Sequence, residues 1–226
     1  MSAFRRDDDG RLRAIFTSQE SHVLINLTEQ LLELLGEGAS QISQEADPFL
    51  HLVGFGANDA PPEDPVLRRL LPDAYDDIEA AAEFRRYTEH GLREKKRAHA
   101  LTIYEALIPQ DEEWNADNPI DRGSIEIDIA PIQVMDWLSG LNDLRLALAV
   151  RLGIEKNENP SRLKSDSPQS RTHTSGSAEG DESADSASGT AKRFELMKES
   201  DPMKAVYAVY NWLGSIQQSL IEALNP

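Results

Sequence analysis

The sequence predicts a mainly α protein: a helical bundle of about four to six helices with a minor two-stranded β-sheet and a disordered acidic insertion. Three observations favour this fold class. Apolar residues recur at helical spacing over long stretches. Alternating apolar and polar residues occur in only two short stretches. A segment between two helical stretches is rich in Ser, Gly, Asp and Glu, with one Leu and no aromatic residue.

The two alternating stretches each lead directly into a helix. Residues 11–17 (RLRAIFT) read as a half-buried strand, and Thr17 and Glu20 then have the spacing of a capping box at the start of a leucine-rich helix. Residues 124–129 (SIEIDI) form the second strand, and Pro131 opens another long helix. We therefore expect the two strands to pair with each other beside the bundle.

Further helices are predicted between and after these strands. Residues 64–71 (DPVLRRLL) predict a short helix. Residues 73–107 are helical in pattern, in two pieces, because Gly91 weakens continuity and Thr88 can cap the second piece. A final helix with a strong apolar face begins at Pro202.

The chain is expected to form one helical domain with appendages. Residues 1–10 are assigned to a flexible N-terminus, and residues 11–156 and 193–226 to the domain. Residues 157–192 form a disordered acidic Ser/Gly-rich linker within it, because they offer too little apolar surface to offset the entropy of ordering. No stretch is long and apolar enough to span a bilayer, so we expect a cytoplasmic protein without a membrane partner.

Composition narrows the function classes. The 226 residues contain 23 Lys and Arg against 40 Asp and Glu, a net charge of -17, and no cysteine. The absence of cysteine excludes disulfides, thiolate nucleophiles and cysteine-ligated zinc. The acidic balance disfavours broad attraction to nucleic acid, so DNA is a partner only if a local basic patch contacts it.

The search for catalytic and metal-binding patterns yields no positive signal. The sequence has no G-x-S-x-G, no P-loop and no HExxH. Asp73, Asp76 and Glu83 share one helix face, and a carboxylate metalloenzyme built on them is one alternative. The Glu-x-x-His pair that usually completes such a site is missing. We expect no catalytic residue, no metal site and no cofactor.

One charged residue lies inside an apolar helical stripe. In LNDLRLALAVRLG (residues 141–153), Arg145 shares a face with leucines. A buried guanidinium is costly unless it is paired. We expect Arg145 to belong to a structural ion network with Asn142, one turn away, and with the carboxylates of Glu83 or Asp73. The other interpretation is a ligand-binding site.

Cations concentrate between residues 84 and 99, beside an acidic block over residues 37–82. The two segments can neutralise each other, or the cations can be solvated. Alternatively, the basic helix touches phosphates or an acidic partner. The candidates for partner or nucleic-acid contact are Arg85, Arg86, Arg93, Lys96 and Arg97.

Four stretches carry a family resemblance in their order and spacing: DPVLRRLLPDAY, AAEFRRYTEHGLREKK, WLSGLNDLRLALAVRLGI and VYNWLGSIQQSLIEAL. Together they resemble an actinobacterial family classified as a domain of unknown function, whose named members are AosR-like oxidative-stress transcription regulators. The resemblance runs from about Leu12 to Ile154 and again from about Val206 onward. It implies a cytoplasmic, mostly helical regulator that acts on transcription under oxidative stress by contacting other proteins.

The leading hypothesis is therefore a non-enzymatic regulatory protein that acts mainly through protein–protein contacts with the transcription machinery. The alternative is a DNA-binding regulator that uses the basic helix over residues 85–97. The resemblance ties redox sensing in the family to cysteines, so direct thiol sensing is not expected from this cysteine-free chain.

Overall fold

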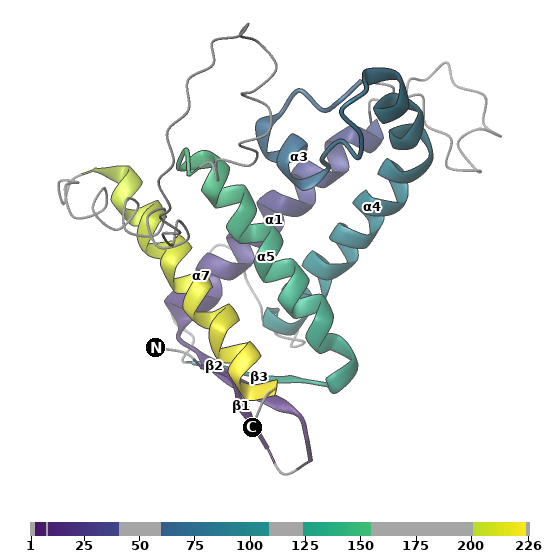
Figure 1. Ribbon diagram of the computed structural model, residues 1–226. Coiled ribbons are helices and arrows are strands. Elements are labelled where there is room, and N and C mark those ends of the chain that lie inside the picture. The colour runs from purple at the N-terminus through teal and green to yellow at the C-terminus, as the bar shows by residue number, and fades with distance from the viewer. Residues whose placement is uncertain (1–2, 8, 41–59, 109–123, 155–200, 225–226) are drawn as a thin grey trace, which may run out of the picture.

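The computed structural model describes residues 3–7, 9–40, 60–108, 124–154 and 201–224. The described residues form five α-helices and a small sheet, which confirms the predicted fold class (Figure 1). The predicted linker over residues 157–192 lies outside the described residues. In chain order the elements are β1 (Arg5–Arg6), β2 (Leu12–Phe16), α1 (Ser18–Ser40), α3 (Pro65–Leu70), α4 (Ile78–Leu107), β3 (Ile125–Ile129), the 3₁₀ turn η2 (Pro131–Gln133), α5 (Val134–Arg151) and α7 (Pro202–Leu224).

The sheet is antiparallel, in the order β1-β2-β3. The predicted pairing of the two alternating stretches is confirmed, with Leu12 opposite Ile129 and Phe16 opposite Ile125. The sheet nevertheless has three strands, because Arg5–Arg6 adds a third on the free side of β2. A two-residue strand is too short to show alternation in the sequence. Arg5 and Arg6, which lie within the segment expected to be a flexible N-terminus, thus pair with the sheet.

An aromatic cluster joins the sheet to the helices. Phe16 is fully buried at the end of β2, and its ring meets Phe4 edge-on at a centroid distance of 6.2 Å and Trp212 of α7 at 6.5 Å. Phe4 also meets Trp137 of α5 edge-on at 5.8 Å. Edge-to-face pairs of this kind are favoured by the ring quadrupoles. The first residues and the last helix therefore share one core.

The predicted capping box at the start of α1 is formed, and its glutamate also binds α7. The Thr17 backbone N–H donates to Glu20 Oε2 at 2.9 Å, and the Glu20 N–H donates to Thr17 Oγ1 at 3.3 Å. The Trp212 indole N–H donates to the second oxygen of the same carboxylate at 3.1 Å. One side chain thus caps α1 and fixes α7 against it.

Helix α4 is continuous from Ile78 to Leu107, so the predicted break near Thr88 and Gly91 is wrong. The Thr88 hydroxyl donates back to the Phe84 carbonyl at 2.8 Å and does not cap a new helix. A glycine in a helix costs about 1 kcal/mol relative to alanine, which the packing of so long a helix offsets.

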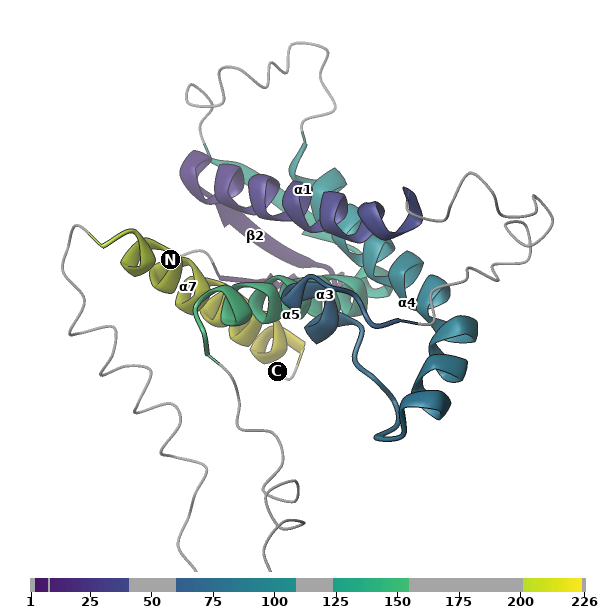
Figure 2. The same cartoon turned by 90° about the horizontal axis from the view of Figure 1, so that it is seen from above.

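Helix α5 is central, because it packs against α1, α3, α4 and α7 (Figures 1 and 2). It approaches α4 closely at Gly140. A Cβ added to Gly140 would lie 2.6 Å from Ile103 Cδ1 and 3.1 Å from the His99 carbonyl oxygen. The absence of a side chain therefore sets the separation of the two helices. No described helix is long and apolar enough to cross a membrane.

We expect Gly140→Ala to lower the free energy of unfolding by about 1–3 kcal/mol, because the new methyl group must displace Ile103 or the α4 backbone. Gly91→Ala is the matched control. Nothing lies within 4 Å of a Cβ at Gly91, so alanine there should stabilise α4 by up to about 1 kcal/mol. Urea denaturation followed by circular dichroism measures both changes. Equal effects of the two substitutions would contradict the close crossing.

Candidate functional site

The basic helix turns much of its charge inward. Arg85 Nη1 donates to Glu89 Oε2 at 2.7 Å, and Arg93 Nε donates to Glu89 Oε1 at 2.9 Å. All three side chains are at most 7% exposed. Arg85 Nη2 also donates to the half-exposed carboxylate of Asp73. Glu89 is thus shared by two buried guanidiniums, each four residues away on the same helix.

Burial and ion pairing have opposite effects on the pKa of Arg85. Burial alone would lower the pKa of the Arg85 guanidinium, but its hydrogen bonds to Glu89 and Asp73 outweigh burial and raise the pKa above its ordinary value. Arg85 therefore stays charged in the folded protein.

The neighbouring cations of α4 bind other helices. Arg93 Nη1 donates to the Leu35 carbonyl at 3.3 Å, and Arg97 Nη1 donates to the Leu32 carbonyl at 3.1 Å, both in α1. Lys96 Nζ lies 2.7 Å from Oδ1 of the buried Asp143 in α5. These contacts hold α4 between α1 and α5.

The five predicted contact residues are therefore placed in three ways. Arg85, Arg93 and Lys96 are engaged with carboxylates inside the protein, and Arg97 binds a backbone carbonyl. Arg86 is exposed. The helix consequently does not present these cations as one continuous solvent-facing stripe. The spacing of Arg85, Glu89 and Arg93 is a sequence signal that could have indicated this pairing.

Arg145 lies apart from the carboxylates that were expected to bind it. Its Nη1 donates to Gln217 Oε1 of α7 at 2.6 Å, and its guanidinium lies over the Tyr210 ring, 5.2 Å from the centroid. Asp73 is engaged with Arg85, and Glu83 is exposed on α4. The expected network therefore does not come together around Arg145 in the described residues. Of the three expected partners, Asn142 alone lies near Arg145, and both residues line one pocket.

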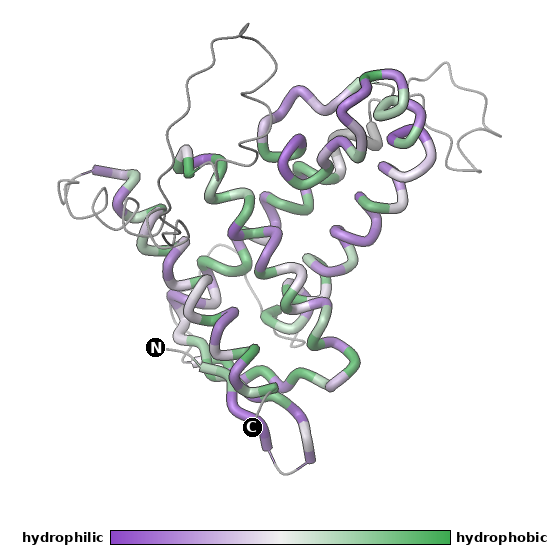
Figure 3. Tube along the Cα trace, viewed as in Figure 1, coloured by the Kyte–Doolittle hydropathy of each residue, from purple (hydrophilic) through white to green (hydrophobic). Residues whose placement is uncertain are grey.

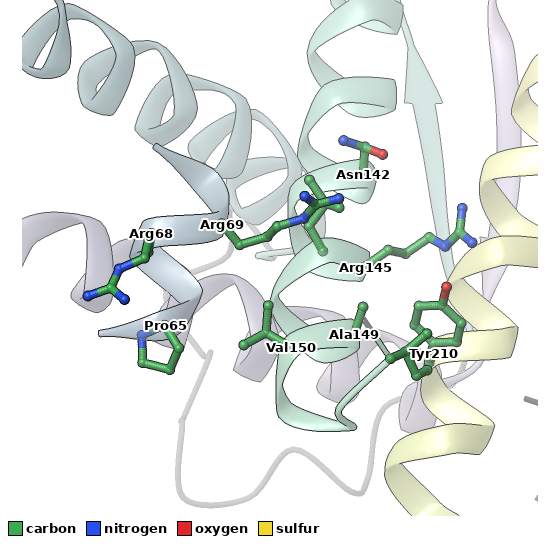
Figure 4. A pocket seen from close by; sticks show the side chains of 10 residues that line it. Pro65, Arg68, Arg69, Asn142, Arg145, Ala149, Val150 and Tyr210 are labelled. Carbon is green, nitrogen blue, oxygen red and sulfur yellow. The ribbon is translucent and has the colours of Figure 1, made fainter. Parts of the chain in front are cut away.

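This pocket has a volume of about 550 Å³ and lies where α3, α5 and α7 meet (Figure 4). Arg68 and Arg69 come from α3, whereas Arg145 and Asn142 come from α5. The wall of the pocket is otherwise mainly apolar. Its remaining lining residues are Pro65, Leu146, Ala149, Val150, Ile154 and Tyr210.

The carboxylates considered for a metal site do not converge. Asp73 pairs with Arg85, and Asp76 and Glu83 are exposed. Among the described residues, no group of three or more His, Cys, Asp or Glu side chains could hold a metal ion.

The N-terminal half of α4 and the turn before it expose aromatic side chains. Tyr75, Phe84 and Tyr87 are 53%, 43% and 59% exposed, and the rings of Tyr75 and Phe84 meet edge-on at 5.6 Å. We call these three residues the aromatic patch. Exposed carboxylates surround it, including Asp76 and Glu83. The sequence does not reveal the patch, because aromatic residues at helical spacing are more often buried.

Comparison with known proteins places the chain in a family. Residues 1–224 match the model of DUF2017, a domain of unknown function. The chain belongs to this family. No solved structure matches it significantly.

Several relatives of this DUF2017 chain carry names. It is 32% identical over 175 residues to the putative oxidative stress regulator AosR of Mycobacterium leprae, which covers 71% of this chain and 73% of the relative. It is 30% identical over 168 residues to the oxidative stress regulator AosR of Mycobacterium bovis and of Mycobacterium tuberculosis, with the same coverage. The family resemblance inferred from the sequence is thereby confirmed.

We expect Glu89→Gln to lower the free energy of unfolding by about 3–5 kcal/mol, because it leaves two buried guanidiniums without their shared counter-charge. Glu83→Gln, on the same helix but exposed, should change it by less than about 0.5 kcal/mol. Chemical denaturation of both variants measures the difference. A Glu89→Gln protein as stable as the Glu83→Gln protein would show that the buried pairs contribute nothing.

We expect Arg145→Met to lower the free energy of unfolding by about 1–2 kcal/mol, which is less than the effect of Glu89→Gln. Arg145 is half-buried, and among the described residues its removal leaves Gln217 and Tyr210 without their partner but no buried carboxylate unpaired. The same denaturation measurement compares the two variants. A larger loss for Arg145→Met would show that Arg145 is the more important structural cation.

Proposed function

We propose that this chain is a non-enzymatic regulatory protein that acts on transcription in response to oxidative stress, through contacts with proteins of the transcription machinery. The observation that carries the proposal is the similarity to relatives named oxidative stress regulators over 71% of the chain. The absence of recognised catalytic motifs in the sequence is consistent with a regulatory role.

Two observations support a protein partner in preference to DNA. The net charge of -17 repels a phosphate backbone over most of the surface. Three cations of α4 that could have offset this repulsion are engaged inside the fold, since Arg85 and Arg93 bind Glu89 and Lys96 binds Asp143. A DNA-binding helix needs several cations free for phosphates at once.

The aromatic patch is the surface that we assign to this partner. Tyrosine and phenylalanine are enriched at protein interfaces, where they bury large areas at a small cost in conformational entropy. The carboxylates of Asp76, Asp77 and Glu83 are exposed close by. They would direct the patch toward a positively charged surface on the partner.

The stress signal must reach such a regulator without a thiol of its own, because the chain contains no cysteine. In our proposal the signal arrives through the partner or through a bound molecule.

We expect affinity capture from cells, with and without peroxide, to recover a transcription-machinery protein with the unaltered chain, and to lose it when Phe84 and Tyr87 are both replaced by serine. Both side chains are exposed, so the double variant should fold normally. Mass spectrometry of the captured proteins measures the loss.

Ile15→Ser is the matched control, because Ile15 is 56% exposed but lies on the outer face of β2, away from α4. It should leave capture unchanged. Recovery of the partner with the Phe84 and Tyr87 double variant would remove the patch from the proposal. Failure to recover any transcription protein with the unaltered chain would contradict the proposed function itself.

A further inference from the structure

We propose that the pocket between α3, α5 and α7 is a binding site for a small organic phosphate. This inference does not depend on the proposed regulatory function. It rests on the charge of the pocket, the state of Arg145 and the apolar wall.

The pocket concentrates positive charge in an acidic protein. Arg68, Arg69 and Arg145 line it, and none of the described residues that line it is acidic. Figure 4 shows Arg69 extending from α3 across α5, and Arg145 extending from α5 toward Tyr210 of α7. Cations gathered from two elements around a hollow with low-dielectric walls produce a local positive potential that attracts an anion.

Arg145 keeps hydrogen-bonding capacity for a ligand. Its guanidinium makes one hydrogen bond among the described residues, from Nη1 to the neutral amide of Gln217. Its Nε is buried without a partner beside Gly214 of α7, so the remaining Nη hydrogens are the donors that a ligand in the pocket could reach. Arg85 differs from Arg145, because Arg85 has two carboxylate partners whereas Arg145 has none among the described residues. An anion in the pocket would supply the missing counter-charge.

The geometry favours a phosphoryl group over a single carboxylate. A guanidinium is a planar fork of donors that matches the oxygens of a phosphate, and a dianion can interact with more than one arginine. Asn142 adds an amide donor on the same wall.

The rest of the pocket favours an organic molecule over a free inorganic ion. Leu146, Ala149, Val150 and Ile154 form an apolar wall along the C-terminal half of α5 and just beyond it. The volume of about 550 Å³ lies within the range usual for small-molecule sites. A hollow of this size fits a compact ligand better than a nucleic-acid backbone, which requires an extended row of cations.

The test is isothermal titration of the purified full chain at low salt with adenosine monophosphate, adenosine, inorganic phosphate and citrate. We expect saturable binding of adenosine monophosphate, weaker binding of inorganic phosphate, and no binding of adenosine. Arg145→Gln should weaken the binding of adenosine monophosphate about tenfold or more, because it removes a charge-assisted hydrogen bond.

Arg151→Gln is the matched control, since Arg151 is exposed at the end of α5 and does not line the pocket. It removes the same charge and should leave the affinity within about twofold. Should circular dichroism show that Arg145→Gln fails to fold, the double variant Arg68→Gln and Arg69→Gln on α3 gives the same test. It should also weaken binding about tenfold or more.

Four results would overturn the proposal. These are no saturable binding of adenosine monophosphate, an equal loss of affinity in Arg151→Gln, equal affinities for adenosine and its monophosphate, and binding of citrate alone. Loss of a captured protein in Arg145→Gln, without phosphate binding by the unaltered chain, would instead assign the pocket to an acidic protein segment. None of these outcomes depends on whether the captured partner belongs to the transcription machinery.

Discussion

The arrangement of the helices depends on the carboxylate of Glu89. The N-terminal two thirds of α4 bury Ala81, Arg85, Glu89 and Arg93, one residue per turn, without a large apolar side chain among them. Apart from Ala81, the buried apolar residues of this helix are Ala100, Ile103 and Leu107 near the sheet, and Figure 3 shows α4 more hydrophobic there than in its middle. Without Glu89, two guanidiniums would lie against α1 and α3 with no shared counter-charge, at a cost that burial of Ala81 cannot offset.

Two groups of arginines can thus be distinguished, those that stabilise the fold and those that line the candidate binding pocket. Arg85 and Arg93 have their charge balanced within the fold, and they hold α4 in place. Among the described residues, Arg145 contacts a neutral amide and an aromatic face and no carboxylate, and it lines a hollow with Arg68 and Arg69. A buried charge that its own fold has satisfied has little left to offer a ligand. A charge beside a pocket that the fold satisfies only in part can still bind a ligand.

Local features were predictable from the sequence, whereas the partners of long side chains were not. The capping box of Thr17 and Glu20 and the alternation of β2 and β3 depend on neighbours within a few residues, so their patterns were sufficient. The partner of Arg145 was not predictable, because Gln217 is 72 positions away on another helix. Helical periodicity showed that Arg145 shares a face with leucines, but it could not show which helix covers that face. For the same reason the burial of Arg85 and Arg93 was not predicted, since the charged face of a helix usually contacts solvent.

The contact between the two ends of the described chain also determines when folding can be completed. The Phe4 N–H donates to the Ser219 hydroxyl across a sequence separation of 215 residues, and Phe16 packs on Trp212. Contacts between such distant residues require closure of a very large loop, which slows folding. During synthesis the first strands leave the ribosome long before α7 does. Their aromatic side chains therefore stay incompletely covered until the last helix arrives, and throughout that interval the nascent chain is exposed to aggregation and to chaperone binding.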